Sequence, residues 1–300
     1  RAAASASARS AAGERGWAGD FRSVPVITSD PEARASLLPA ILGYWAGQLQ
    51  PPEAQTPAMR PADITSTILY RDAAMIVLNK PAGIAVHAGS GRNEGLDRSF
   101  DALAFGLDRP PALAHRLDKD TSGCLVLGRS REALARLGKL FQRGAVAKTY
   151  WAIVVGVPRA QEGDIDLPLA RRSHDRRSWV MKVADPGDAA AEPARTSWRV
   201  MTAGDGLALV ELTPHTGRTH QLRVHCMAMG WPIAGDPIYG GDRAKAVARH
   251  LQLHARRIVV PFDPKGAAVD ITAPLPEHMA GLIRMVGLDP AALDATPGER

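Results

Sequence analysis

Short apolar runs separated by turn-forming residues constrain the fold of this chain more than any other feature. After residue 64 they predict strands over 68–70, 75–78, 124–127, 150–155, 196–201 and 207–212. Gly204-Asp205-Gly206 separates the last two runs, so we expect these two strands to form a hairpin. Because helical patterns do not alternate regularly with the strands, the arrangement is typical of an α+β fold rather than of repeated βαβ units.

Two segments instead repeat their apolar residues at helical spacing. The first covers residues 131–143, and Gly144 suits its C-terminal cap. The second covers residues 220–229, has one apolar face and ends at Gly230. The glycine-rich stretch 90–97 predicts a loop.

The N-terminal part differs from the rest in composition. Its first 20 residues are rich in Ala, Ser, Gly and Arg and offer little to bury. Residues 1–58 contain five arginines and five acidic residues, so the net charge of +6 belongs to the remainder. We therefore expect 1–58 to be a disordered or non-native extension and 59–300 to form one folded domain. The alternative is an organellar transit peptide, which the Ser and Arg content of the first residues favours and the five acids oppose.

Composition excludes several classes of protein. The apolar runs are too short to cross a bilayer, so we expect no membrane association. Two cysteines, Cys124 and Cys226, form neither a disulfide framework nor a metal-ligand pattern. A pI near 9.6 suits a polyanionic partner, because basic groups release counterions from phosphates.

Five segments carry the chemistry of the chain. They are LNKPAGIAVH at 78–87, HRLDKDTSG at 115–123, KTY at 148–150, TGRTHQLRVH at 216–225 and GDPIYG at 235–240. In this order and spacing they resemble the motifs of the RluA family of RNA pseudouridine synthases, over residues 65–280. The resemblance implies the pseudouridine synthase catalytic fold over 59–300, a long mixed, mostly antiparallel sheet with flanking helices and a central cleft.

The resemblance also implies a reaction, the isomerisation of specific uridines in structured ribosomal or transfer RNA to pseudouridine. The bond from ribose C1′ to uracil N1 breaks and the base rejoins through C5, with no redox change. We therefore expect no cofactor and no metal. The reaction needs one carboxylate as nucleophile, base or stabiliser of charge on the sugar. The resemblance assigns that role to Asp118, although an aspartate before Lys-Asp-Thr-Ser-Gly, taken by itself, is better explained as a turn cap.

The motifs supply further candidate site residues. By resemblance, Arg218 is the ion-pair partner that keeps Asp118 ionised, and Tyr150 packs against the target uracil. Arg116 is expected to fill the gap that a flipped nucleotide leaves. Lys148 is a candidate phosphate contact, and Leu222 a candidate apolar wall of the uracil pocket.

Other motif residues favour structural roles. We expect His115 to be a hydrogen-bonded structural residue rather than an acid catalyst, and Lys80-Pro81 to shape the first-motif loop. The arginines at 171, 172, 176 and 177 are explained equally by phosphate contacts and by a solvated loop.

Two other functions remain open at this point. One is a non-catalytic RNA-binding or chaperone protein that retains the fold. The other is a retaining glycosidase, which needs two carboxylates about 5–5.5 Å apart, with Asp120 as the second. We expect a cytoplasmic monomer with RNA as its only partner, or an organellar protein if 1–58 is a transit peptide.

Overall fold

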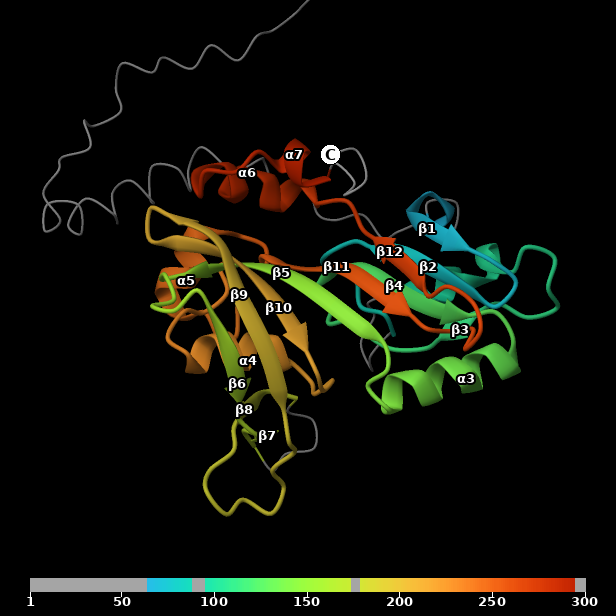
Figure 1. The fold of residues 1–300 in the computed structure, drawn as a ribbon, viewed down its shortest axis with the longest axis horizontal. Helices are drawn as coiled ribbons and strands as arrows, with labels where there is room; N and C mark the ends of the chain where they lie inside the picture. The colour runs from blue at the N-terminus through green and yellow to red at the C-terminus, as the bar shows by residue number, and fades with distance from the viewer. Residues whose placement is uncertain (1–63, 88–94, 174–178, 295–300) are drawn as a thin grey trace, which may run out of the picture. The chain divides into compact units, whose positions relative to one another are not determined.

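The computed structural model describes residues 64–87, 95–173 and 179–294 (Figure 1). The expectations for residues 1–58 fall outside these ranges. Within them, one large sheet organises the chain and is built from ten strands.

The main path of this sheet brings together strands that are distant in the sequence. Its order is β1 (Ile68–Arg71), β2 (Met75–Lys80), β4 (Ser122–Gly128), β11 (Leu253–Val260), β5 (Ala147–Val155), β10 (Leu207–Pro214), β9 (Arg195–Gly204) and β6 (Glu162–Asp166). Two short strands join it at the side: β3 (Ala112–Leu113) pairs with β4, and β12 (Val269–Thr272) with β11. Among the described strands, β4 and β11 pair in parallel and the other pairs are antiparallel. A separate hairpin consists of β7 (Leu169–Arg171) and β8 (Met181–Val183).

Helices cover the sheet on both sides (Figure 1). On one side lie α3 (Arg131–Gln142) and α4 (Gln221–Ala228), and on the other α6 (Glu277–Met285) and α7 (Pro290–Asp294). The remaining helices are η2 (Thr65–Thr67), η3 (Leu96–Leu103) and α5 (Gly241–Val247). The α3 helix begins at Arg131 because the Ser130 hydroxyl accepts a hydrogen bond from the Ala133 N–H, at 3.1 Å.

The core lies on both faces of the sheet because the central strands are apolar on both faces. Successive side chains of a strand point to opposite faces, so β5 serves two clusters. Ala152 and Val154 pack in one cluster, and Trp151, Ile153 and Val155 in the other. Full burial of each Val or Ile stabilises the fold by about 1.5–3 kcal/mol. This packing fixes the position of β5, the strand that carries Lys148 and Tyr150.

The predicted α+β class is confirmed, and the predicted strands and helices are present with bounds that differ by a few residues. The expected hairpin is also present: Leu207 pairs with Gly204, and Asp205 and Gly206 both have positive φ, as a two-residue turn of this kind requires. The loop predicted at 90–97 is partly wrong. Leu96 and Asp97 begin η3, with Leu96 buried in the core, and residues 90–94 lie outside the described residues.

Candidate active site

A cavity of about 550 Å³ lies where the loop before β4, strand β5 and the loop before α4 meet. Its volume is within the range of small-molecule sites, about 300–1,000 Å³. All six predicted site residues line it: Arg116, Asp118, Lys148, Tyr150, Arg218 and Leu222. Segments about 100 residues apart thus meet at one place, as the resemblance implied.

Asp118 is held in a tight loop between β3 and β4. The Thr121 N–H donates to the Asp118 carbonyl oxygen at 3.2 Å, and Leu117 is buried in the core beside it. Gly123 follows with φ of +105°, and a Cβ there would lie 2.3 Å from the Ala255 carbonyl oxygen. Glycine is therefore required where β4 meets β11 in parallel, and this close approach fixes the loop that carries Asp118.

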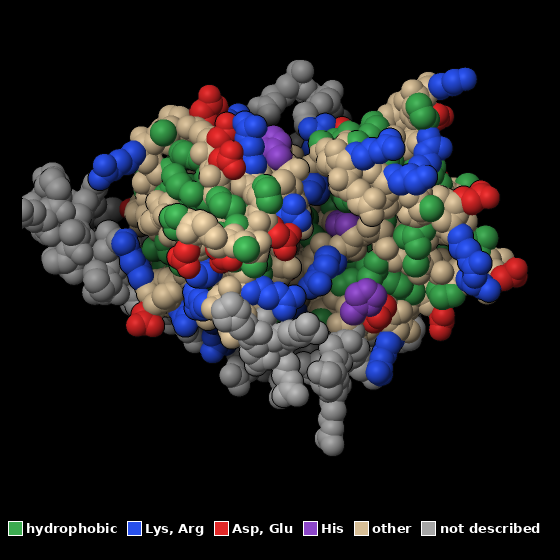
Figure 2. Space-filling model, turned by 90° about the horizontal axis from the view of Figure 1, so that it is seen from below, with side chains coloured by type: hydrophobic (Ala, Val, Ile, Leu, Met, Phe, Trp, Pro, Cys, Tyr) green, Lys and Arg blue, Asp and Glu red, His purple; other side chains and the backbone are tan. Residues whose placement is uncertain are grey.

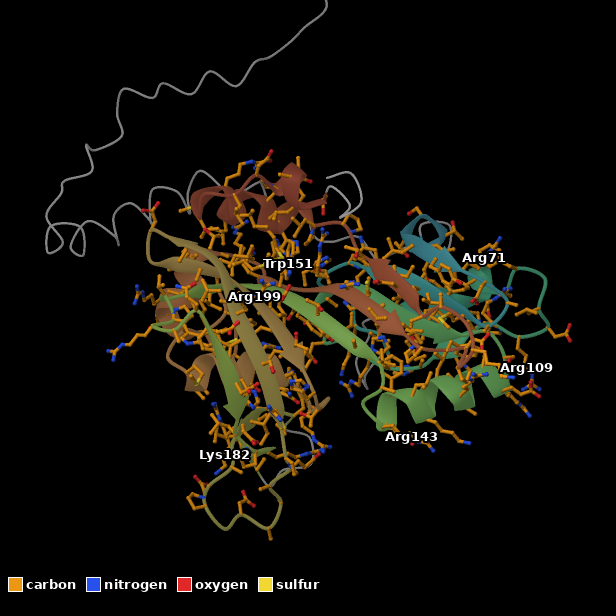
Figure 3. All side chains as sticks on the ribbon, in the orientation of Figure 1. Arg71, Arg109, Arg143, Trp151, Lys182 and Arg199 are labelled. Carbon is orange, nitrogen blue, oxygen red and sulfur yellow. The ribbon has the colours of Figure 1, made fainter. Side chains whose placement is uncertain are left out.

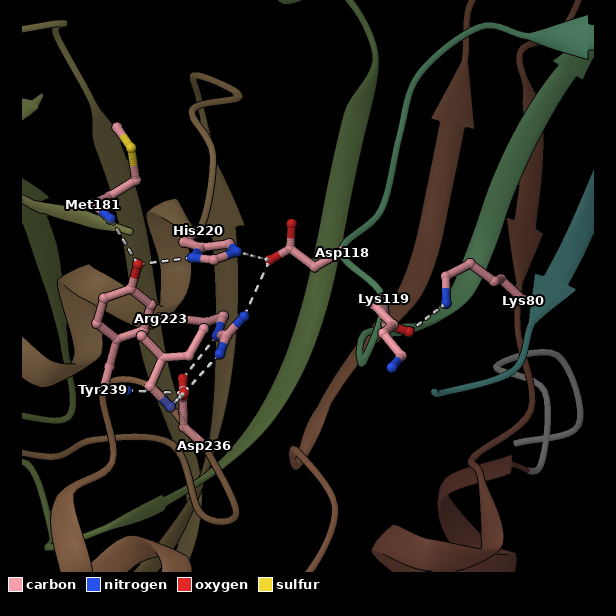
Figure 4. Close-up of polar contacts among 9 residues, drawn as sticks. Lys80, Asp118, Lys119, Met181, His220, Arg223, Asp236 and Tyr239 are labelled. Carbon is pink, nitrogen blue, oxygen red and sulfur yellow. Dashed lines mark hydrogen bonds and ion pairs between the residues drawn. The ribbon is translucent and has the colours of Figure 1, made fainter. Parts of the chain in front are cut away.

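Two side chains from the α4 region face the Asp118 carboxylate (Figure 4). Arg223 Nη1 lies 3.6 Å from Asp118 Oδ2, and His220 Nε2 lies 3.7 Å from the same oxygen. The Asp118 side chain is one-fifth exposed, so its carboxylate is within reach of a bound molecule.

The ion-pair partner predicted for Asp118 was wrong. Arg218 Nη1 instead pairs with Glu192 Oε2 at 2.7 Å, and Arg218 Nε donates to the Pro193 carbonyl oxygen at 3.0 Å. Arg218 stands before α4 begins, and its backbone N–H donates to Gln221 Oε1. This hydrogen bond holds the loop, and the guanidinium lies at the cavity wall but beside Glu192. Arg223, inside α4, takes the role expected of Arg218.

The buried Asp236 carboxylate holds the Arg223 guanidinium by the two nitrogens that do not face Asp118. Asp236 accepts from Arg223 Nε and Nη2, each at 2.7 Å, and the two side chains are 1% and 2% exposed. The N–H groups of Ile238 and Tyr239 also donate to Asp236. Burial acts to raise the pKa of Asp236, but the Arg223 bonds and charge outweigh it and lower that pKa. The residues of the GDPIYG motif therefore aim Arg223 at Asp118, a function that the sequence did not reveal.

His220 belongs to the site and was missed from the sequence. It has φ of +54°, which turns its ring toward Asp118 just as α4 begins. The Tyr239 hydroxyl accepts from the Met181 N–H at 2.9 Å and lies 2.7 Å from His220 Nδ1. If the hydroxyl donates to Nδ1, the Nε2 nitrogen carries the proton and donates toward Asp118. Burial lowers the pKa of His220 although the Asp118 charge opposes this, which favours the neutral ring.

Tyr150 and Leu222 form the apolar part of the cavity. Tyr150 lies on β5 between the partners Leu212 and Ala255, and it packs against two core clusters. Burial, followed by the Asp118 charge, raises the pKa of Tyr150, so its hydroxyl stays protonated at neutral pH. Leu222 is buried in one of the same clusters. Together they present a ring and an aliphatic surface to any molecule in the cavity.

Lys80 joins the first motif to the loop of Asp118. It is fully buried, and its Nζ donates to the carbonyl oxygens of Pro81 and Ile84, each at 2.8 Å. The same Nζ donates to the Lys119 carbonyl oxygen at 2.9 Å (Figure 4). Burial lowers the pKa of Lys80 to about 7. This geometry agrees with the predicted role of Lys80 in shaping the first-motif loop, and extends it to the Asp118 loop.

His115 is held as a structural residue, as predicted. Its Nε2 accepts the Val126 N–H at 3.0 Å, and its ring stacks on Phe141 with centroids 4.5 Å apart. Burial lowers the pKa of His115 to about 3, so the ring is neutral at physiological pH.

Cations surround the cavity. Figure 2 shows Lys and Arg side chains on both sides of the central hollow. Arg116 is exposed, and Arg143 points outward from the end of α3 (Figure 3). Burial lowers the pKa of Lys148, which lines the cavity wall. Of the arginines expected at 171–177, Arg171 and Arg172 are exposed beside β7, and Arg176 and Arg177 lie outside the described residues.

Comparison with known proteins matches this site to a family. The model of the RNA pseudouridylate synthase family matches residues 74–228, which include Asp118, Tyr150 and Arg223. The chain belongs to this family. An uncharacterised RNA pseudouridine synthase of Zymomonas mobilis is 39% identical over 73% of this chain and 98% of its own length. Ribosomal large subunit pseudouridine synthase C of Haemophilus ducreyi is 36% identical, over 74% of this chain and 69% of its own length.

Solved structures agree with this assignment. Human RNA pseudouridylate synthase domain containing 4 has a TM-score of 0.62 at 29% identity, covering 75% of this chain and 95% of that protein. The expected pseudouridine synthase fold and the resemblance to RluA-type enzymes are thereby confirmed. This pseudouridine synthase is an isomerase that converts uridine in RNA to pseudouridine.

None of the helices in the described residues is long and apolar enough to span a membrane. No group of three His, Cys, Asp or Glu side chains in the described ranges is arranged to hold a metal ion.

Proposed function

We propose that Asp118 is the catalytic carboxylate and that the substrate is ribosomal RNA of the large subunit. The observation that carries the first part is the placement of Asp118 at the cavity, one-fifth exposed and faced by Arg223 and His220. The second part is supported by relatives whose names place them on the large ribosomal subunit, among them synthase D of Zymomonas mobilis at 36% identity over 75% of this chain. Transfer RNA is the alternative substrate.

The reaction requires the target uridine to leave its stack and enter the cavity. There the Tyr150 ring replaces part of the lost stacking, and Leu222 closes the apolar wall. Asp118, faced by Arg223, lies beside the ribose and uracil, where its carboxylate acts as nucleophile, base or stabiliser while the base turns. His220 Nε2 lies 3.7 Å from the same oxygen and so borders the space in which the Asp118 side chain can turn. The charged groups in this mechanism, Asp118 and Arg223, both belong to the protein.

The surroundings of the cavity suit a nucleic acid. Arg116 and Lys148 line it, so they are placed to contact the phosphates or the vacated stack beside a flipped nucleotide. Arg218 lies in the same wall and is exposed by 37% while paired with Glu192. We assign it to substrate contact at the rim rather than to Asp118.

We also propose that residues 59–300 form the catalytic unit and that the enzyme works as a monomer in the cytoplasm, with RNA as its partner.

Pseudouridine mapping tests the proposal. Carbodiimide-induced reverse-transcription stops are compared in cells that lack the protein and in cells that express wild type, Asp118→Asn or Asp120→Asn. We expect one large-subunit site with wild type and with Asp120→Asn, and no site with Asp118→Asn. Asp120→Asn is the matched control because it changes a second carboxylate in the same loop.

Other results would change the assignment. Normal modification by Asp118→Asn would refute the catalytic role of Asp118. A site confined to transfer RNA would replace the ribosomal substrate. A phenotype rescued fully by Asp118→Asn, without any modification, would instead favour an RNA chaperone.

A further inference from the structure

Trp179 presents a large aromatic surface to water at the edge of the active site. It is 56% exposed, more than the other exposed large hydrophobic residues of the described ranges. Its ring is perpendicular to that of His220, with centroids 5.2 Å apart. Since His220 faces Asp118, one side chain separates Trp179 from the catalytic carboxylate.

The exposure of Trp179 is not explained by packing. Burying a tryptophan ring is strongly favourable, so a ring left more than half in water beside His220 offers its open face to a bound molecule. Contact with His220 holds one side of the indole and leaves the rest open. Trp179 is not in the cavity wall, whereas Tyr150 is. The two rings therefore serve different positions, one inside the cavity and one outside it.

We propose that Trp179 stacks on an unpaired nucleobase adjacent to the target uridine. This inference rests on the proposed function, because it requires an RNA strand at the cavity. When the target uridine leaves the stack, its neighbour loses a stacking partner, and an indole face at the rim restores one. Every base has a π face, so this contact stabilises the strand without selecting its sequence.

The hydrogen bonds of the residues next to Trp179 also favour binding of an RNA strand at this position. The Arg172 N–H donates to the carbonyl oxygen of Val180 at 2.8 Å, which places an exposed arginine across from the residue after Trp179. An arginine next to a stacking ring suits the phosphate of the stacked nucleotide. Two residues after Trp179, the Met181 N–H donates to Tyr239, which lies against His220. Trp179 is thus connected to the same hydrogen bonds, through Met181 and Tyr239, that orient His220.

Binding measurements on three variants test the inference. Trp179→Ala and Trp179→Phe are titrated with an oligouridylate of about 12 nucleotides, a length suited to single-strand sites. The control is Phe105→Ala, which removes another exposed aromatic residue, one that pairs with Arg71 and does not line the cavity. We expect Kd to rise about 5- to 150-fold for Trp179→Ala, the range for loss of one base–aromatic stack. Trp179→Phe falls in between, and Phe105→Ala stays within about twofold of wild type.

Two further readouts separate stacking from a structural role. RNA binding should quench tryptophan fluorescence in wild type, and this component should be absent from Trp179→Phe although that variant still binds. With ribosomal RNA freed of protein as substrate, kcat at saturation should stay near the wild-type value while KM rises. An unchanged Kd for Trp179→Ala, or a loss of kcat at unchanged KM, would overturn the inference.

The outcome is distinguishable from failure of the proposed function. Asp118→Asn should bind the oligouridylate with wild-type affinity and make no pseudouridine. If wild type makes no pseudouridine in ribosomal RNA, the substrate proposal fails whatever the affinity of the Trp179 variants. If wild type is active and Trp179→Ala binds normally, only the stacking inference fails.

Discussion

Replacing Asp236 with asparagine tests the buried network behind Asp118, the carboxylate that we propose as catalytic. Asp236→Asn keeps the shape of the side chain and removes its charge. One oxygen can still accept from Arg223 Nη2 and from the N–H groups of Ile238 and Tyr239, but an amide NH₂ then faces the Nε–H of Arg223. Two charge-assisted bonds of 2.7 Å are lost or weakened, and Arg223 stays 2% exposed with Asp118 as its remaining acidic partner.

The loss of folding free energy expected for Asp236→Asn follows from the burial of the Asp236–Arg223 pair. Removing one partner of a buried ion pair costs about 3–5 kcal/mol, and we take about 3 because Asp118 still faces Arg223. Tm should therefore fall by about 6–12 °C. Because the pKa of Asp236 is lowered in the folded state, its contribution is present above its unfolded pKa of about 3.9 and is lost as the pH falls. The difference between variant and wild type should therefore shrink below about pH 4.

Urea unfolding and a modification assay measure the two consequences. Free energies of unfolding come from the urea midpoint, and kcat from nuclease digestion of the RNA and chromatography of uridine and pseudouridine. We expect kcat to fall about 10- to 100-fold, since Arg223 is no longer aimed at Asp118.

The matched control is Asp270→Asn, which breaks a similar bidentate pair with Arg257 on the surface. That pair is 51% and 43% exposed, so its loss should cost about 0–1 kcal/mol and leave kcat unchanged. Equal effects of Asp236→Asn and Asp270→Asn on stability and kcat would refute the reasoning.

Two further changes test the rest of the network. Tyr239→Phe removes the hydroxyl between Met181 and His220, so kcat should fall about 10-fold while the Kd for RNA, measured by filter binding, stays the same. A larger change in Kd than in kcat would contradict the positioning role of Tyr239. Lys80→Met tests the buried ammonium. Because the pKa of Lys80 falls from 10.5 to about 7 on folding, the unfolded state binds more protons than the folded state between these pH values. The free energy of unfolding of wild type should therefore rise with pH over this range. Urea midpoints between about pH 7 and 10 should rise less steeply for Lys80→Met, and parallel curves would show that Lys80 stays protonated.

Local pattern was sufficient for the elements, whereas the family resemblance of the motifs supplied Asp118 as the candidate carboxylate. The strands β2, β4 and β5 are apolar runs of the expected length, and α3 follows the spacing of its leucines and a serine cap. These features depend on neighbours in the sequence, through side-chain periodicity and the hydrogen bonds of helix ends. The motifs then located six residues that do line one cavity.

Only the tertiary structure decided which arginine faces Asp118. Arg218 and Arg223 share one motif, and nothing local distinguishes their charges. The decision depends on where α4 begins: Arg218 precedes it and turns to Glu192, while Arg223 lies inside it and is held by Asp236. Asp236 is 13 residues further along, and His220 needs a left-handed backbone and Tyr239 to face the carboxylate. The sequence determined which groups were available, whereas packing between distant segments determined their distances, because ion pairs and hydrogen bonds form only where the folded backbone brings the atoms together.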